Sequence, residues 1–261
     1  MTMYFVSDIH GQYLALQKAL REVSFSPESG DQLYVLGDLV DRGPHSREVL
    51  LELLGMQQSY PNQVILLKGN HEQMLQDWLL RQGNPEMYLR FNGGDATIRS
   101  LLHDHPLRRA FLSSMPSGEV QEEARNLILA RYPQLLSALS SLPLYVDLPH
   151  GRSNGAPPVL LVHAGIRPGL PLNRQKPDDL LWIREPFYNH YNGELGVVFG
   201  HTPVNRLPGY TGNGPWQRNN IVGIDGGAAY HRLLLLLEWP TMRSLSIPIR
   251  DLGRSVSVRL S

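Results

Sequence analysis

The stretch Gly37-Asp38-Leu39-Val40-Asp41-Arg42-Gly43 decides the fold of this 261-residue chain, together with Gly69-Asn70-His71-Glu72 further on. The first directly follows the apolar run Leu33 to Leu36, and the second follows Val64 to Leu67 after one residue, Lys68. The polar residues therefore stand where a strand gives way to a loop. In open α/β sheets ligands gather at the carboxyl ends of the strands, so this placement predicts a ligand site at a sheet edge.

Apolar runs of strand length recur along the chain and are nearly continuous rather than alternating. Strands of this kind are covered on both faces, which is typical of layered α/β proteins. Helical patterns follow the first three runs, namely the stripes Leu16-Ala19-Leu20-Val23 and Val49-Leu50-Leu53-Leu54, and a segment from Glu72 to Arg81 that Gly83 ends. The predicted strands are Tyr4 to Val6, Leu33 to Leu36, Val64 to Leu67, Val159 to Val162, Gly196 to Phe199, Ile221 to Ile224 and Leu233 to Leu237.

Residues 84–145 break this rhythm of strands. The segment contains scattered prolines and predicts helices around Glu119 to Tyr132 and around Gln134 to Leu139. We expect it to form a helical insertion that covers one side of the site.

Two segments rich in Gly and Pro, residues 150–158 and 207–219, are expected to be loops, the second with an exposed Trp216. The chain shows no internal repeat and no clear domain boundary. A single domain over residues 1–261 is therefore expected, whereas the sequence does not indicate an oligomeric state.

The composition excludes several classes of function. The formal net charge is zero, so no global basic field recruits nucleic acid or an anionic membrane, and we expect neither as a partner. The chain has no cysteine, which excludes disulfides, thiolate catalysis and Cys-ligated zinc. The first eight residues lack the features of a signal peptide, and Leu233 to Leu237 is far too short to span a membrane. We expect a soluble, cytoplasmic protein.

Oxygen and nitrogen ligands for a first metal ion follow the first two strands. Asp8 and His10 stand two residues apart and can point the same way once the strand unwinds into a loop. Asp38 can bridge two metals because a carboxylate has two oxygens.

Ligands for a second metal ion follow later strands. Asn70 offers a neutral carbonyl oxygen, and His163 and His201 offer imidazole nitrogens. Mixed oxygen and nitrogen ligation suits Mn, Fe, Zn, Co or Ni better than Ca. Two ions about 3.5–4 Å apart can clamp a phosphoryl group and acidify a bridging water.

Five blocks in this order resemble the phosphoprotein phosphatase (PPP) family of calcineurin-like metallophosphoesterases, over about residues 4–238. These blocks are Asp8-x-His10, Gly37-Asp38-x-x-Asp41-Arg42-Gly43, Gly69-Asn70-His71-Glu72, His163-Ala164-Gly165 and Gly200-His201-Thr202-Pro203. Similarity to the bacterial and phage serine/threonine phosphatase branch lies in Asn92-Gly93-Gly94, Leu181-Trp182-Ile183-Arg184-Glu185 and Ile224-Asp225-Gly226-Gly227-Ala228. The resemblance implies a four-layer αββα sandwich with the helical insertion.

The resemblance also implies the chemistry. Two divalent ions, Mn²⁺ first, hold a bridging hydroxide that attacks phosphorus directly and in line. Arg42 and Arg184 match the family's phosphate-binding arginines, and His71 matches its general acid, oriented by Asp41. We expect this buried His–Asp pair to favour the imidazolium form. By the same resemblance, Asn92 lines the substrate site.

Some of these assignments have alternatives. Arg167 or Arg174 can take the place of Arg184, because bidentate arginines are not unique in sequence. Asp41 can instead pair only with its neighbour Arg42.

Asn92 can instead supply left-handed backbone geometry in its Gly-rich turn, and Asp225 is expected to form a structural turn. The remaining histidines carry no motif and are expected to be ordinary surface or core residues: His45, His103, His105, His150, His190 and His231.

The leading prediction is a metal-dependent phosphatase acting on phosphoserine or phosphothreonine in proteins, and also on phosphotyrosine or small phosphomonoesters. The main alternative is a symmetrical dinucleoside tetraphosphate hydrolase or another polyphosphate- or RNA-cap-cleaving relative. Asp41 and Glu72 favour the phosphatase, because one group of those hydrolases has Ala and Asp at the matching positions. A non-catalytic pseudophosphatase would lack part of the motif set, and none is missing. A nuclease is disfavoured by the neutral charge and by Asp41-Arg42-Gly43.

Overall fold

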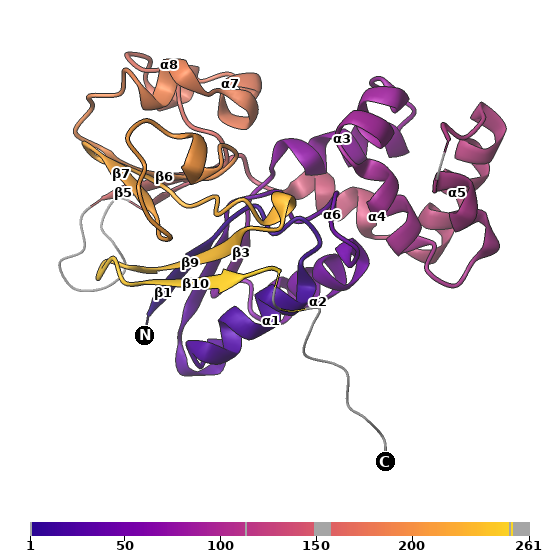
Figure 1. The fold of residues 1–261 in the computed structure, drawn as a ribbon, viewed down its shortest axis with the longest axis horizontal. Helices are drawn as coiled ribbons and strands as arrows, with labels where there is room; N and C mark the ends of the chain where they lie inside the picture. The colour runs from indigo at the N-terminus through magenta and orange to yellow at the C-terminus, as the bar shows by residue number, and fades with distance from the viewer. Residues whose placement is uncertain (1, 113, 149–157, 251, 253–261) are drawn as a thin grey trace.

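Two five-stranded sheets form the centre of the computed structural model, which describes residues 2–112, 114–148, 158–250 and 252 (Figure 1). The first sheet has the order β10-β9-β1-β2-β3 and the second β4-β5-β6-β8-β7. Strands β1, β2 and β3 are parallel, as are β5, β6 and β8, and the other strands pair antiparallel. The strands are β1 Met3–Val6, β2 Gln32–Val35, β3 Val64–Leu66, β4 Tyr145–Leu148, β5 Val159–Val162, β6 Gly196–Phe199, β7 Trp216–Arg218, β8 Ile221–Gly223, β9 Leu233–Trp239 and β10 Ser244–Pro248.

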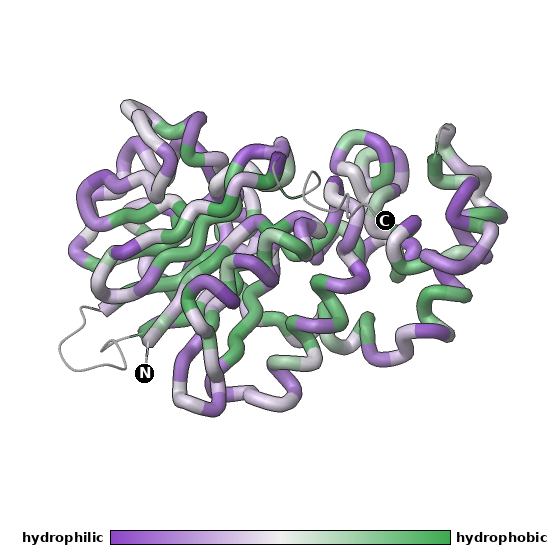
Figure 2. Tube along the Cα trace, turned by 60° about the horizontal axis from the view of Figure 1, so that its bottom comes forward, coloured by the Kyte–Doolittle hydropathy of each residue, from purple (hydrophilic) through white to green (hydrophobic). Residues whose placement is uncertain are grey.

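Both faces of the central strands are buried, as their continuous apolar runs predict. In β1, Phe5 packs between the two sheets with Leu36 and Leu161, whereas Tyr4 and Val6 pack on the opposite face beneath the helices. Figure 2 shows the resulting concentration of hydrophobic segments in the interior. The predicted α/β class is confirmed, with sheet packed on sheet and helices outside.

Helices α1 (Tyr13–Glu22) and α2 (Ser46–Ser59) cover the first sheet, and α7 (Pro177–Trp182) and α8 (Glu185–Tyr188) lie beyond the second (Figure 1). The predicted stripes of α1 and α2 contribute to the same buried cluster as the sheet. Helix α3 (Asn70–Leu79) begins two residues earlier than predicted and ends before Arg81, whose φ of 63° cannot continue a helix.

The described part of segment 84–145 is mostly helical up to the start of β4 at Tyr145, and it joins the apolar cluster of the first sheet. Both helices predicted there are confirmed. The segment contains η2 (Met87–Phe91), α4 (Gly94–Leu101), η3 (Pro106–Phe111), α5 (Gly118–Arg131) and α6 (Leu135–Ser141). Short 3-10 turns elsewhere are η1 (Pro27–Ser29), η4 (Leu172–Arg174), η5 (Val204–Arg206) and η6 (Ala228–Tyr230). Within the described ranges, no helix has the length and apolarity needed to cross a membrane.

At the sheet edges the structure differs from what the sequence predicts. Strands β4, β7 and β10 were not predicted, because polar residues on their outward faces interrupt the apolar runs. The expectation of an exposed Trp216 is wrong. Its ring packs against Phe199 with centroids 6.2 Å apart, and its indole Nε1 donates to the carbonyl oxygen of Pro208 at 2.9 Å. Residues 150–157 of the other predicted loop lie outside the described residues.

Replacing Trp216 with Ala should lower the free energy of unfolding by about 3–5 kcal/mol, because it opens a cavity beneath the second sheet. Trp182, which is 42% exposed, provides the matched control. Trp182→Ala should change the same quantity by about 1 kcal/mol or less. Denaturant unfolding of both variants measures the difference, and equal losses would contradict the buried position of Trp216.

Candidate active site

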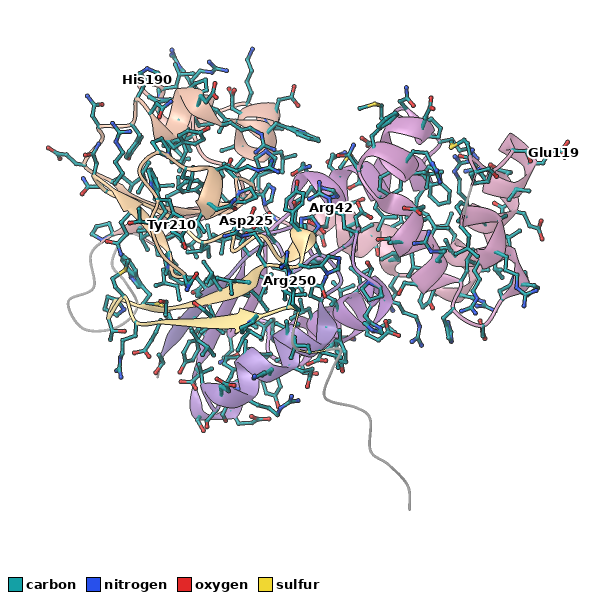
Figure 3. All side chains as sticks on the ribbon, viewed as in Figure 1. Arg42, Glu119, His190, Tyr210, Asp225 and Arg250 are labelled. Carbon is teal, nitrogen blue, oxygen red and sulfur yellow. The ribbon has the colours of Figure 1, made fainter. Side chains whose placement is uncertain are left out.

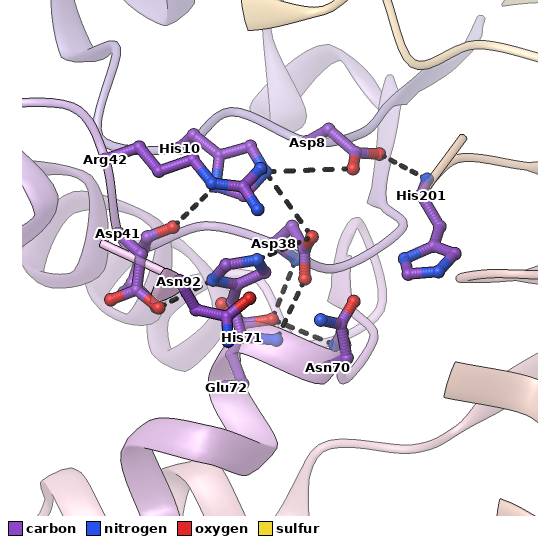
Figure 4. Close-up of polar contacts among 12 residues, drawn as sticks. Asp8, His10, Asp38, Asp41, Arg42, Asn70, His71, Glu72, Asn92 and His201 are labelled. Carbon is purple, nitrogen blue, oxygen red and sulfur yellow. Dashed lines mark hydrogen bonds and ion pairs between the residues drawn. The ribbon is translucent and has the colours of Figure 1, made fainter. Parts of the chain in front are cut away.

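The residues predicted as metal ligands converge at one edge shared by the two sheets (Figure 4). Each follows the carboxyl end of a parallel strand, since β1, β2, β3, β5 and β6 all end there. All of them are buried, with side chains at most 6% exposed. They are Asp8, His10, Asp38, Asn70, His163 and His201.

Asp38 lies between two groups of ligand atoms. Its Oδ2 is 3.4 Å from Nε2 of His10, which in turn lies 3.9 Å from Oδ1 of Asp8. Its Oδ1 is 3.4 Å from Nε2 of His163, and that nitrogen is 2.9 Å from Oδ1 of Asn70. Each carboxylate oxygen of Asp38 therefore faces a different group.

The imidazole rings are oriented by the protein backbone. Nδ1 of His10 donates to the carbonyl oxygen of Val40, and Nδ1 of His163 donates to that of Leu36, both at 2.8 Å. A ring that gives its Nδ1 proton to a carbonyl presents the lone pair of Nε2, the orientation seen around protein-bound metals.

This donor set fits divalent cations. Nε2 of His201 is buried and has no hydrogen-bond partner among the described residues. Burial raises the pKa of Asp38, and the nearby carboxylates of Asp8 and Glu72 raise it further. Clusters formed by His10, Asp38 and His71, and by Asp38, His163 and His201, bring their ligand atoms within 4.8 Å of one another. Positive charge at these two places would satisfy both the orphaned nitrogen and the crowded carboxylates.

The backbone at the site adopts conformations that side chains usually avoid. Positive φ angles occur at Asp8, His10, Asp38, Asp41, Arg42 and His201, between 46° and 71°. Such residues cost on the order of 1–3 kcal/mol each and persist only where the surroundings enforce them. Hydrogen bonds between the loops provide that enforcement: the backbone N–H of His10 donates to the carbonyl of Asp38 at 2.9 Å, and that of His201 to Oδ2 of Asp8 at 2.9 Å.

Glycines allow the loops to approach so closely. A Cβ atom on Gly69 would collide with the backbone and carboxylate of Asp38, and one on Gly200 with Ser7 and Asp8. These glycines directly precede Asn70 and His201. The motif requires glycine there because a neighbouring loop lies too close to leave room for a side chain.

Glu72 ties the loops after β2 and β3 together. Its Oε2 accepts from the backbone N–H of Asp38 at 2.7 Å and of Gly69 at 2.9 Å, and its Oε1 accepts from that of Leu39 at 2.8 Å. Burial raises the pKa of Glu72 to about 7, against the three hydrogen bonds, which lower it. Sequence reasoning assigned Glu72 no structural role, although its place three residues after the N-cap Gly69 matches a capping box.

His71 and Asp41 form a buried pair beside Asp38. Nδ1 of His71 donates to Oδ2 of Asp41 at 2.6 Å, while the hydroxyls of Tyr88 and Thr97 donate to Oδ1 at 3.1 and 2.6 Å. The alternative in which Asp41 pairs only with Arg42 is thereby wrong. Burial raises the pKa of Asp41 to about 7 and lowers that of His71, with further lowering by Arg42. The expectation of an imidazolium is therefore wrong for these residues alone.

The two predicted phosphate-binding arginines reach the site from opposite sides. Nη1 of Arg42 lies 3.4 Å from Nε2 of His10. Nη1 of Arg184 donates to Oγ1 of Thr202 at 3.1 Å, beside His201. Arg167 is instead committed to Asp179 through Nε and Nη2, at 3.0 and 2.5 Å, which argues against it as a replacement for Arg184.

Asn92 and Asp225 lie in turns that adjoin site residues: the backbone N–H of Arg42 donates to the carbonyl of Gly93 at 3.1 Å, and burial together with the nearby carboxylate of Asp8 raises the pKa of Asp225. Asn92 has a φ of −107°, so the left-handed position belongs to Gly93, with a φ of 78°. Its amide donates to the carbonyl of Met87 at 2.8 Å. Asp225 forms the predicted turn, since its Oδ1 accepts from the N–H of Gly227 at 2.8 Å.

The comparisons with known proteins agree with this geometry. Residues 1–225 match the family described as calcineurin-like phosphoesterase. The chain belongs to this family. It is 31% identical to serine/threonine-protein phosphatase 1 of Salmonella typhimurium, with 90% of each protein aligned. The resemblance to the phosphoprotein phosphatases is thus confirmed, and this metallophosphoesterase is a hydrolase.

Other relatives carry a different name. The metallophosphoesterase is 26% identical to the asymmetrical bis(5'-nucleosyl)-tetraphosphatase PrpE of Anoxybacillus flavithermus, over 93% of this chain and 92% of that protein. A crystal structure provisionally described as a diadenosine tetraphosphatase superposes with a TM-score of 0.60 at 25% identity, over 95% of this chain and 93% of the other.

Tyr230 is a site residue that the sequence did not reveal. Its ring lies under the guanidinium of Arg42, 5.4 Å from ring centroid to Cζ, and that of Arg206 lies 4.9 Å from the same ring. Tyr230 follows the turn formed by Asp225 and Gly227, which was expected to have a structural role only. In this metallophosphoesterase the aromatic face holds Arg42 toward the ligand residues.

Tyr230→Ala should lower kcat/KM for p-nitrophenyl phosphate by about threefold, because a cation–π contact at a half-exposed site contributes roughly 0.5–1 kcal/mol. Tyr230→Phe keeps the ring and should retain the wild-type value. In an Arg42→Ala background the alanine substitution should have no further effect. A loss in Tyr230→Phe equal to that in Tyr230→Ala would assign the role to the hydroxyl instead.

Proposed function

We propose that this metallophosphoesterase uses two divalent metal ions to hydrolyse phosphate monoesters, first of all phosphoserine and phosphothreonine in proteins. The observation that carries this proposal is the position of Asp38, whose two oxygens each face a separate cluster of ligand atoms. When bound, two ions, Mn²⁺ first, would supply an acidified water for in-line attack and positive charge for the phosphoryl oxygens.

The ligand sets divide at Asp38. Asp8 and His10 would hold the first ion with Oδ2 of Asp38. The second ion would be held, with Oδ1 of Asp38, by Asn70, His163 and His201. The backbone hydrogen bonds of the histidine Nδ1 atoms keep each Nε2 aimed inward, so the chain is prepared for both ions before they bind.

Substrate binding is assigned to the two arginines. Arg42 approaches from the His10 side and Arg184 from the His201 side, so a phosphoryl group between them can be bound by planar guanidinium groups on two faces. Asn92 is proposed to contact the same group, since the carbonyl of its neighbour Gly93 accepts a hydrogen bond from the backbone N–H of Arg42 at 3.1 Å.

Protonation of the leaving oxygen is assigned to His71. Its ring is fixed through Nδ1 by Asp41, which leaves Nε2 on the side of Asp38, 3.9 Å from Oδ2. A bound phosphate dianion would raise the pKa of His71, since an opposite charge favours the imidazolium. Serine and threonine alkoxides are poor leaving groups and need such a proton, which supports a monoester substrate. The 31% identity to a protein phosphatase supports the same substrate class.

A second candidate is the hydrolysis of dinucleoside tetraphosphates, favoured by the PrpE relatives. Those relatives are named asymmetrical, whereas the sequence had indicated the symmetrical type for this alternative. Symmetrical cleavage of diadenosine tetraphosphate by water gives two ADP, and asymmetrical cleavage gives ATP and AMP. The products therefore separate the two modes.

Steady-state kinetics with Mn²⁺ test the proposal. Phosphoserine and phosphothreonine peptides should release phosphate with a larger kcat/KM than diadenosine tetraphosphate. The Asp38→Asn protein, purified in parallel, controls for contaminating phosphatases. A larger kcat/KM for the dinucleotide would replace the first candidate with the second, and no hydrolysis of any phosphoester with Mn, Fe, Zn, Co or Ni would refute both.

His71→Asn should reduce kcat for a phosphoserine peptide by about 10²–10⁴-fold, the usual contribution of a general acid. The reduction for p-nitrophenyl phosphate should be much smaller, because p-nitrophenolate leaves without a proton. Metal content, measured on the same samples, should stay at the wild-type level. Equal losses for the two substrates would argue against proton donation by His71.

A further inference from the structure

A cavity of about 710 Å³ opens beside Arg42, between the loop after β2 and the helical insertion. Helix α4 contributes Arg99 to its lining, and η3 contributes Arg108 and Arg109. Figure 3 places Arg42 where the sheets meet the insertion. Arg42 also reaches His10, so one side chain both lines the cavity and borders the candidate active site.

The lining of this cavity is strongly basic. Four arginines line the cavity. Among the described residues that line it, Glu48 is the single acidic one. Oε1 of Glu48 is 3.1 Å from Nη1 of Arg47, outside the lining, so its charge is offset locally. Three histidines, His45, His103 and His231, complete the ionisable groups that line the space.

The arginines that line the cavity differ in the number of hydrogen bonds and ion pairs they make within the protein. Arg99 donates through Nη1 to the carbonyl of Phe111 at 2.7 Å and pairs with Asp95, so it is held in place by the fold. Arg108 donates to the carbonyl of His103 at 2.8 Å. The guanidinium of Arg109 has no hydrogen-bond or ion-pair partner among the described residues. Arg108 and Arg109 are exposed and retain donors for a ligand.

We propose that this cavity binds a second phosphate group of the substrate, next to the phosphoryl group that is hydrolysed. The assignment rests on the proposed two-metal hydrolysis and specifies what its substrate carries. A volume of about 710 Å³ lies in the range of small-molecule sites, roughly 300–1,000 Å³. Arginine forks bind phosphate oxygens in pairs; the described residues offer the guanidinium of Arg109 no partner, and Arg108 keeps donors beyond its bond to His103.

Arg42 links the two phosphate positions. Its guanidinium, placed over Tyr230, is within reach of the site on one side and lines the cavity on the other. The second phosphate can come from two sources: the next phosphate of a phosphate chain, or a second phosphorylated side chain of the same peptide. The insertion thus acts in substrate selection.

The test uses the full chain carrying Arg108→Gln and Arg109→Gln. A matched control carries Arg218→Gln and Arg243→Gln, which removes the same charge at exposed positions on β7 and beside β10. The substrates are p-nitrophenyl phosphate, a singly phosphorylated peptide, the same peptide with a second phosphoserine, and diadenosine tetraphosphate, all with Mn²⁺.

The Arg108/Arg109 variant should lose about tenfold or more in kcat/KM, through KM, on substrates with a second phosphate. Its kcat/KM should stay within about twofold of wild type on the singly phosphorylated substrates. The control variant should stay within the same limit on all four substrates. Loss on the doubly phosphorylated peptide alone identifies a peptide phosphate as the source, and loss on the dinucleotide alone identifies a phosphate chain. Equal loss on all four substrates, or loss on none, would overturn the proposal.

Binding of inorganic tripolyphosphate, followed by calorimetry on chelator-treated protein, separates this proposal from the proposed function. Wild type should bind tripolyphosphate at low ionic strength about tenfold more tightly than the Arg108/Arg109 variant, and the control variant should match wild type. This result can be obtained even if no phosphoester is hydrolysed. Indistinguishable binding by wild type and variant would refute the second phosphate site, whatever the enzyme hydrolyses.

Discussion

The carboxylate of Glu72 is the constraint on which the site depends. It accepts hydrogen bonds from the backbone of Asp38, Leu39 and Gly69, so one buried side chain joins the loops that follow β2 and β3. A buried N–H without a partner costs about 1–3 kcal/mol, and this residue satisfies three at once. The loops cannot separate without exposing those donors. Asp38 is thereby held against Gly69, the residue that precedes Asn70. The arrangement of ligand atoms around Asp38 follows from this connection.

The same loops hold strain. Six site residues have positive φ, and at roughly 1–3 kcal/mol each their summed cost is comparable with the net stability of a domain, about 5–15 kcal/mol. The sandwich core and the inter-loop hydrogen bonds sustain this cost. In return the buried carboxylates and imidazoles stay close together before any cation arrives, which is the preorganisation that phosphoryl transfer requires. The aromatic contact of Tyr230 extends that order to Arg42.

The sequence predicted those features that repeat a local pattern. Continuous apolar runs predicted the central strands, and polar residues at strand ends predicted the convergence of Asp8, Asp38 and His201. Edge strands such as β7 were missed because polar residues interrupt their apolar pattern. Trp216 was expected to be exposed because its neighbours in sequence are rich in Gly and Pro, and its contact with Phe199 joins distant segments. The contacts of Tyr230 and the basic cavity depend on segments distant in sequence, which no local spacing encodes.

Metal stoichiometry tests the central claim most directly. Chelator-treated protein should bind two Mn²⁺ per chain in a calorimetric titration, with catalytic activity returning as the second site fills. The Asp38→Asn protein should lose high-affinity binding at both sites, because each carboxylate oxygen faces one ligand group. A single bound ion at full activity, or an Asp38→Asn protein that still binds two ions tightly, would contradict the account.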